Sequence, residues 1–216
     1  MPHLLHLDSS IDPARSRSRA ITAAFADAWR ARGDGFTVTY RDLHTDPVPH
    51  LTSAASHWAP DLRQPGAVPP PEEEARQQQL IAELTAADVL LVGAPMYNYS
   101  LPSTLKAWID HIHVPGVTTP FGNDAQPLAG RPAVIATSRG AVYDAGTETE
   151  GWDHTVPPLR LILGTALGMD VTVLQTSLTL ADVVPAMAEQ QPRAEAELAA
   201  AIARARELGT SLPVPL

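Results

Sequence analysis

The sequence predicts an α/β protein, a doubly wound parallel sheet with helices on both of its faces. Short apolar runs alternate along the chain with amphipathic helical stretches, and two of these runs, 89–92 and 133–136, are apolar throughout. Strands that are covered on both faces lack an alternation of apolar and polar residues. Strands that alternate with helices form right-handed βαβ units, which build a parallel sheet.

Each element follows from the local pattern, taken in order along the chain. Residues 3–8 form the first expected strand, and residues 17–32 form a helix with an apolar stripe at Ile21, Phe25 and Trp29. Expected strands at 36–41 and 170–175 alternate apolar and polar residues, which is typical of positions near a sheet edge. The remaining expected elements are strands at 88–93 and 133–137 and helices at 72–87, 101–111, 156–167 and 188–208. Residues 43–71 hold several prolines and no sustained periodicity, so they predict a long irregular loop.

Length and composition limit the possible functions. A chain of 216 residues, 44% of them apolar, predicts one domain over residues 1–216. The formal net charge of −9 argues against a nucleic acid or an anionic membrane surface as the main partner. With no cysteine in the sequence, any redox chemistry requires a bound cofactor. The pattern predicts no signal peptide and no membrane-spanning segment, and the expected location is the cytoplasm.

Three loops that follow expected strands carry most of the candidate binding residues. Ligands of an open parallel sheet bind beyond the carboxyl ends of its strands, so these loops share one edge. Hydroxyls, a guanidinium and a helix N-terminus in the first loop predict an anion site. The simpler alternative is that its serines only cap the helix. The candidates are Ser10, Ser16, Arg17 and Ser18 in the first loop, Pro95, Met96, Tyr97, Asn98 and Tyr99 in the second, and Ser138, Arg139, Gly140 and Ala141 in the third.

The aromatic residues of the second loop predict a flat ligand. Tyr97 and Tyr99 come directly after a buried strand, and exposed rings there cost stability unless a ligand stacks on them. The alternative is that both rings pack on the proline-rich segment. Gly140 in the third loop permits a close approach of the backbone to a ligand.

Other patterns are absent or weaker. The sequence lacks the G-x-G-x-x-G fingerprint of a Rossmann dinucleotide-binding site and the P-loop of a nucleoside triphosphatase. It also lacks the G-x-S-x-G elbow of a serine hydrolase. These three classes of protein are therefore not favoured. His111 and His113 have no evident third ligand, so no metal site is predicted. Asp153 and His154 form either an acid–base pair or an ordinary helix start.

Taken together, these motifs resemble the FMN-dependent NADH azoreductase and quinone oxidoreductase family. The resemblance rests on residues 9–11 with 16–18 (SSI and SRS), 94–99 (APMYNY), 105–110 (LKAWID), 138–143 (SRGAVY) and 165–169 (TALGM). Each motif is short, but their order and spacing match over nearly the whole chain. The resemblance implies a flavodoxin-like fold with five parallel strands in the order 2-1-3-4-5.

The resemblance also implies a cofactor, a reaction and an assembly. FMN is expected to bind with its phosphate and ribityl chain at Ser10, Ser16, Arg17 and Ser18. Its isoalloxazine is expected along residues 95–99, with residues 138–141 at the other edge. NADH or NADPH then serves as co-substrate for a two-electron ping-pong reduction of quinones or azo compounds by a homodimer. The expected substrate pocket holds Trp58, Phe121 and Tyr143, and His154 and Tyr143 are the candidate proton donors.

The sequence departs from the family pattern at three positions. Arg17 stands where Gln is frequent, Tyr99 where Phe is frequent, and Ala141 where a second Gly is frequent. Residues 118–123, which border the expected substrate pocket, are less alike. Three other functions stay open from the sequence: a tailoring flavoreductase for one aromatic or N–N bonded metabolite, a flavodoxin-type electron carrier, and a flavin-free interaction protein on the same fold.

Overall fold

The sheet has five parallel strands in the predicted order. The computed structural model describes residues 1–213, so the last three residues of the expected 1–216 domain lie outside the described residues. The sheet order is β2-β1-β3-β4-β5. The strands are β1 (His3–Asp8), β2 (Thr37–Asp42), β3 (Val89–Gly93), β4 (Pro132–Ser138) and β5 (Asp170–Thr176). The α/β class, the flavodoxin-like fold and the strand order are thus confirmed, and the two alternating strands do lie at the edges.

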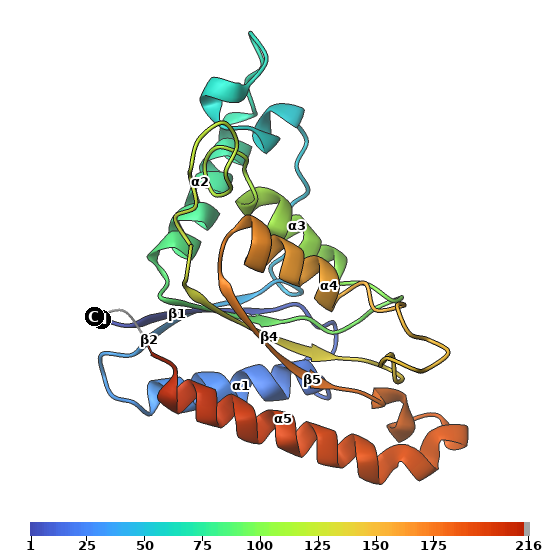
Figure 1. Cartoon of the computed structure of the whole chain (residues 1–216). Coiled ribbons are helices and arrows are strands. Elements are labelled where there is room, and N and C mark those ends of the chain that lie inside the picture. The colour runs from blue at the N-terminus through green and yellow to red at the C-terminus, as the bar shows by residue number, and fades with distance from the viewer. Residues whose placement is uncertain (214–216) are drawn as a thin grey trace.

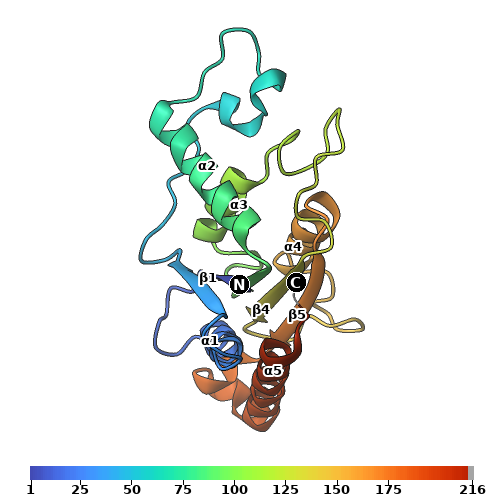
Figure 2. The ribbon, with the colours of Figure 1, turned by 90° about the vertical axis from the view of Figure 1, so that its left-hand side faces the viewer.

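Helices cover both faces of the sheet. The helices α1 (Arg17–Arg30) and α5 (Gln191–Ser211) lie side by side under one face (Figure 1). The helices α2 (Pro71–Ala86), α3 (Ser103–Ile112) and α4 (Val156–Leu159) lie on the other face, as the second view also shows (Figure 2). Because side chains alternate along a strand, each strand feeds both cores: Leu4 packs with Phe25 and Trp29 of α1, whereas Leu5 packs with Trp108 of α3.

The expectation of one continuous α-helix at 156–167 is wrong. Only Val156–Leu159 is α-helical, and Arg160–Ala166 continues as a π-helix. In this stretch the N–H of Leu167 donates to the carbonyl of Ile162, five residues back, at 2.9 Å. Over so few turns, the apolar spacing of an α-helix and that of a π-helix are too similar to be separated from the sequence.

The irregular segment 43–71 is anchored on the helical layer. It contains two short 3₁₀ turns, Ala54–His57 and Pro60–Leu62. The buried carboxylate of Glu73, in the first turn of α2, accepts hydrogen bonds from the N–H and hydroxyl of Thr52, both at 2.7 Å, and from the hydroxyl of Ser56. The ring of His111 on α3 contacts the carbonyl of Pro49 at 2.9 Å. These contacts give a segment without regular structure a defined position.

Candidate functional site

A polar cavity lies where β1 and β3 end. Its volume is about 440 Å³, and its walls come from the loops after β1, β3, β4 and β5. Parallel strands bring their carboxyl ends to one edge, which is why loops distant in sequence meet here. The lining residues are Ser10, Asp12, Arg15, Ser16, Arg17, Pro95, Met96, Tyr97, Ser138, Thr179, Asp182 and Val183.

The start of α1 forms one wall of this cavity. Ser16 is the N-cap of α1, because its hydroxyl accepts a hydrogen bond from the N–H of Arg19 at 3.3 Å. Its Oγ also lies 3.0 Å from the Oγ of Ser18, which is fully buried. The capping alternative for Ser16 is therefore realised. The first N–H groups of a helix have no partner within the helix and carry a partial positive charge, so the same wall favours an anion.

Arg17 already has partners in this structure. Its guanidinium donates to Oδ2 of Asp182 at 2.7 Å and to the carbonyl of Ala194 at 3.0 Å. The Arg17 side chain is 8% exposed, whereas that of Asp182 is 50% exposed. The ion pair joins the start of α1 to the segment after β5, across 165 residues of sequence.

A larger and more apolar cavity adjoins the polar one. It has a volume of about 850 Å³ and shares Met96, Tyr97 and Thr179 with its neighbour. A cavity of this size takes a drug-sized ligand. The remaining lining residues are Ile11, Asn98, Tyr99, Leu101, Pro102, Ser103, Gly140, Tyr143 and Leu180.

A tight turn after β3 shapes the boundary between the two cavities. The N–H of Tyr97 donates to the carbonyl of Ser100 at 2.8 Å, and the N–H of Ser100 donates back at 3.0 Å. Asn98 and Tyr99 between them have positive φ values of 50° and 68°. A two-residue turn of this kind requires positive φ at both positions, which Asn adopts readily and Tyr adopts at some cost. Neither the N–H of Asn98 nor that of Tyr99 donates a hydrogen bond within residues 1–213, so both are available to a ligand.

The phenol of Tyr97 connects this turn to the first loop. Its oxygen lies 3.0 Å from the Oγ of Ser10 and accepts a hydrogen bond from the N–H of Ile11 at 3.1 Å. The backbone of Met96 is held in turn, because its N–H donates to the carbonyl of Ser138 at 2.8 Å. The three predicted loops are thus joined into one structure.

Three aromatic rings stand together beside the larger cavity. The ring of Tyr99 lies edge-on to Tyr143 at 6.3 Å and to Trp152 at 5.7 Å between centroids. Tyr99 and Trp152 are each 48% exposed. Burial raises the pKa of the Tyr143 hydroxyl above its usual value, and the nearby Tyr99 raises it further. Arg139 opposes this shift, and Asp153 adds the smallest contribution to it. Tyr143 is therefore protonated at neutral pH.

Some predicted cofactor residues lie outside both cavities. The guanidinium of Arg139 is buried and paired with Asp144 at 2.8 Å and Asp153 at 3.4 Å, so it does not reach either cavity. Ser18 and Ala141 are also absent from the cavity walls. Gly140 does permit a close approach, but the neighbour is the side chain of Leu180, which would lie 3.0 Å from a β-carbon placed there.

Trp58 and Phe121, expected in the substrate pocket, contact each other and line neither of the two cavities. Their rings lie edge-to-face with centroids 5.2 Å apart, and they are 37% and 50% exposed. The segments that carry them extend beyond α2 and α3, away from the sheet (Figures 1 and 2). They meet because the N–H of Ala59 donates to the carbonyl of Pro115 at 3.2 Å.

The histidines and acids considered from the sequence have structural contacts. Asp153 lies just before α4, and its Oδ1 accepts hydrogen bonds from the N–H groups of Thr155, the N-cap residue, at 2.8 Å and of Val156 at 3.0 Å, which agrees with the helix-start alternative. His154 is exposed, and its N–H donates to the carbonyl of Tyr99 at 2.8 Å. Over residues 1–213, no group of three or more acidic, histidine or cysteine side chains is arranged to hold a metal. No helix in that part of the chain is long and apolar enough to cross a membrane.

The segment after β5 is the part of the site that sequence reasoning missed. Thr179, Leu180, Asp182 and Val183 line the two cavities. The sequence does contain a signal for this segment: the expected last strand is parallel to the others, so the loop after it must lie at the same edge of the sheet. Trp152 had no such signal, because its position depends on a loop without periodicity.

The comparisons with known proteins agree with this geometry. The five-stranded parallel sheet with helices on both faces defines a flavodoxin-like protein, and the model of a family described as having a flavodoxin-like fold matches residues 2–208. The chain is 63% identical over 212 residues to an "FMN-dependent NADH:quinone oxidoreductase" of Kineococcus radiotolerans, covering 98% of this chain and 100% of that one. A protein of the same name from Frankia casuarinae is 43% identical, with 93% and 97% covered. The chain belongs to the family of FMN-dependent NADH:quinone oxidoreductases.

Solved structures share the fold at low sequence identity. An azoreductase from Bacillus anthracis strain Sterne superposes with a TM-score of 0.79 at 18% identity, covering 97% of this chain and 99% of that chain. An FMN-dependent NADH-azoreductase from B. anthracis strain Ames Ancestor, solved in complex with FMN, superposes with a TM-score of 0.77 at 17% identity, with 96% and 98% covered. At this level of identity the likeness establishes the fold.

Proposed function

We propose that this protein is an FMN-dependent oxidoreductase that uses NADH to reduce quinones or azo compounds. The observation that carries the proposal is the pair of adjoining cavities, one polar and one apolar, which share Met96 and Tyr97 at the carboxyl edge of the sheet. Bound FMN supplies the hydride chemistry, as the names of the relatives at 63% and 43% identity imply. The alternative of a tailoring flavoreductase has no separate observation in its favour.

The polar cavity suits the phosphate and the ribityl chain. The hydroxyls of Ser10 and Ser16 and the N–H groups at the start of α1 offer hydrogen bonds to an oxyanion. Arg17 adds a positive charge at the same wall, partly offset by Asp182. The buried hydroxyl of Ser18 contacts the hydroxyl of Ser16 and does not face the ligand.

The apolar cavity suits the ring system and the acceptor. The free N–H groups of Asn98 and Tyr99 are placed to bind the polar edge of a flavin, and hydrogen bonds to that edge stabilise a reduced, electron-rich ring. The exposed ring of Tyr99 and the adjacent Trp152 give a flat acceptor an aromatic surface to stack on. Quinone reduction consumes two electrons and two protons. Tyr143 lines this cavity and is the proposed donor of one proton because of that position, whereas His154 lies outside the cavity walls.

The assembly is proposed to be a homodimer in which each subunit covers its partner's site. Tyr99, at 48% exposure, shows that the larger cavity is open in the single chain. The exposed Trp58–Phe121 pair lines neither of the two cavities. Packing against a second copy would remove the exposed rings of this pair and the open side of the larger cavity from water. The proposed location is the cytoplasm, where NADH is available.

Steady-state kinetics with purified protein test the proposal. Reconstitution with FMN is expected to give a yellow protein that oxidises NADH with a simple quinone as acceptor. Protein that takes up no FMN, or that passes electrons only to a protein partner, would contradict it.

A further inference from the structure

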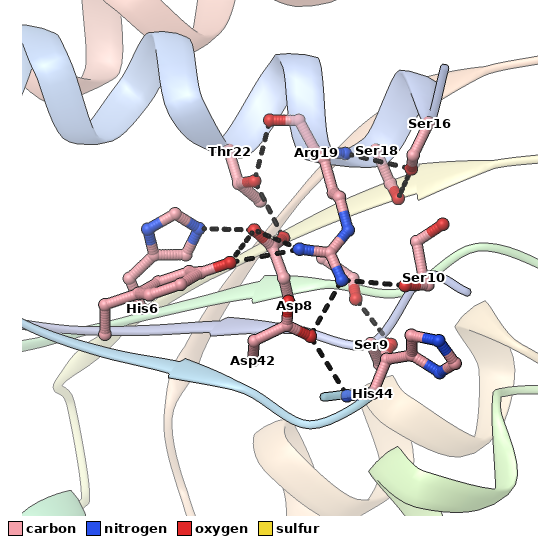
Figure 3. A network of polar contacts seen from close by, with 12 residues as sticks. His6, Asp8, Ser9, Ser10, Ser16, Ser18, Arg19, Thr22, Asp42 and His44 are labelled. Carbon is pink, nitrogen blue, oxygen red and sulfur yellow. Dashed lines mark hydrogen bonds and ion pairs between the residues drawn. The ribbon is translucent and has the colours of Figure 1, made fainter. Parts of the chain in front are cut away.

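A cluster of polar side chains lies directly behind the first loop, outside both cavities, and its members are largely buried except Tyr40, which is 49% exposed. Asp8, 4% exposed at the end of β1, accepts hydrogen bonds from the hydroxyls of Thr22 at 2.9 Å and Tyr40 at 3.2 Å (Figure 3). The ring of His6 approaches the same carboxylate at 3.3 Å. A second carboxylate, Asp42, lies opposite Asp8 on β2.

Arg19 connects this cluster to the loop. One terminal nitrogen of its guanidinium donates to the carbonyl of Ser10 at 2.7 Å and to Oδ1 of Asp42 at 2.8 Å. The other terminal nitrogen donates to the hydroxyl of Tyr40 at 3.0 Å and lies 3.8 Å from Asp8. The side chain is only 11% exposed. A rigid planar fork with five donors can satisfy three acceptors of this kind at once.

The contact with Ser10 fixes the orientation of a peptide group. The carbonyl of Ser10 accepts from Arg19, and the N–H of the same peptide, on Ile11, donates to the phenol of Tyr97 at 3.1 Å. Because the peptide is planar and its C=O and N–H point in opposite directions, holding both ends determines its plane. The Ser10 hydroxyl lies at the wall of the polar cavity, 3.0 Å from the Tyr97 oxygen, and accepts a hydrogen bond from the N–H of Asp12 at 3.3 Å.

Arg19 also holds the second serine of the cavity wall. Its backbone N–H donates to the Oγ of Ser16 at 3.3 Å. A single residue therefore contacts Ser10 through its side chain and Ser16 through its main chain. Its charge also compensates two carboxylates, Asp8 and Asp42, that would otherwise repel an anion bound in front of them.

We infer that Arg19 is a positioning residue for the phosphate group of the cofactor. It does not touch the phosphate, and its guanidinium sets the geometry of the Ser10 peptide, whose side chain lines the cavity beside Ser16. This inference rests on the proposed function, because it takes the polar cavity as the phosphate site. It also predicts that the contribution of Arg19 is specific to the phosphate end of the ligand.

Flavin titrations of the apoprotein test the inference, with riboflavin as the ligand that lacks a phosphate. Arg19→Lys keeps the positive charge but cannot reach all three acceptors. The Kd for FMN is expected to rise about tenfold, the equivalent of roughly one charge-assisted hydrogen bond, while the Kd for riboflavin changes less than about threefold. The matched control is Arg41→Lys, which disrupts a comparable two-point ion pair with Glu83, both contacts at 2.6 Å, away from the loop.

The outcomes separate this inference from the proposed function. A parent protein that binds FMN no better than riboflavin would overturn both. A parent that prefers FMN, combined with an unchanged preference in Arg19→Lys or an equal loss for both flavins, would overturn the role of Arg19 alone. If Arg19→Lys does not fold, Asp42→Asn tests the same contact, since it removes the ion pair but leaves an oxygen acceptor. It is expected to reduce the preference for FMN by a smaller factor, and an unchanged preference would overturn the inference.

Discussion

Substitutions of Arg17 and of Asp182, which form an ion pair, are expected to change FMN affinity in opposite directions. Both residues line the polar cavity, and their side chains are 2.7 Å apart. If a phosphate binds in this cavity, the guanidinium attracts it and the carboxylate repels it. A pair with a purely structural role would instead respond in the same direction to loss of either partner.

The magnitudes follow from the geometry of the cavity. Arg17→Ala removes a charged donor and is expected to weaken FMN binding by roughly 1.5–3 kcal/mol, the scale of a hydrogen bond to a charged group. Asp182→Asn removes a charge from the wall of a cavity of about 440 Å³. Two unit charges ~8 Å apart in water interact by about 0.5 kcal/mol, so losing the repulsion of a phosphate dianion is expected to tighten binding by ~1 kcal/mol, about fivefold.

Calorimetric titration of the apoprotein with FMN and with riboflavin measures both effects. Riboflavin binding is expected to change little in either variant. Asp144→Asn is the matched control, because Asp144 is 48% exposed and pairs with Arg139 at 2.8 Å outside both cavities. Weaker FMN binding in both Arg17→Ala and Asp182→Asn, or equal changes for the two flavins, would refute the assignment of this cavity to the phosphate.

Three further predictions concern packing, pH and assembly. Gly93→Ala places a β-carbon 2.2 Å from Oδ1 of Asp8, so it is expected to lower the free energy of unfolding by about 2–3 kcal/mol, measured by urea denaturation. Burial raises the pKa of Glu73, but hydrogen bonds from Ser56 and Thr52 outweigh burial and leave that pKa lowered. The stabilisation is therefore complete above the pKa of the unfolded chain and lost as pH falls through the lower folded value, and Glu73→Gln is expected to flatten the acid limb of a stability–pH curve. Trp58→Ala is expected to lower quinone turnover and loosen the dimer while leaving FMN affinity intact, which sedimentation and kinetics over a dilution series measure.

Each of these has a clear contrary result. An unchanged free energy of unfolding in Gly93→Ala would mean that Asp8 can move away from the new methyl group. That result would contradict the view that hydrogen bonds from Thr22 and Tyr40 hold Asp8 in place. If the stability of Glu73→Gln falls with acid as steeply as that of the parent, the Glu73 carboxylate does not contribute to the pH dependence of stability. A fully active monomer, with Trp58→Ala equal to the parent, would contradict the shared site.

The parts of the fold that depend on local pattern could be predicted from the sequence. The apolar runs located all five strands to within one or two residues, and β2 begins one residue later than expected, at Thr37. The parallel arrangement then placed the loops after β1, β3 and β4 at one edge, where they do form the cavities. The π-helix at 160–166 was missed because its apolar spacing differs too little from that of an α-helix over two turns.

The parts that depend on long-range contacts could not be predicted. The partners of Arg17 lie 165 and 177 residues away, and nothing near Arg17 in the sequence indicates that Asp182 would neutralise it. Arg139 was assigned to the ligand because it follows a strand, yet Asp144 and Asp153 draw its guanidinium away from the cavity. The sequence pattern does not single out Arg19, since its role depends on Asp42 and Tyr40 of the neighbouring strand.

An anaerobic titration tests the central claim most directly, that one bound FMN at the carboxyl edge of the sheet carries electrons from NADH to a quinone. Protein loaded with FMN is titrated with NADH and then with a simple quinone, and the flavin absorbance is followed. The account predicts that one equivalent of NADH bleaches the bound flavin and that one equivalent of quinone restores it, with no other protein present. Bound flavin that NADH does not bleach, or that a quinone does not reoxidise, would contradict the account.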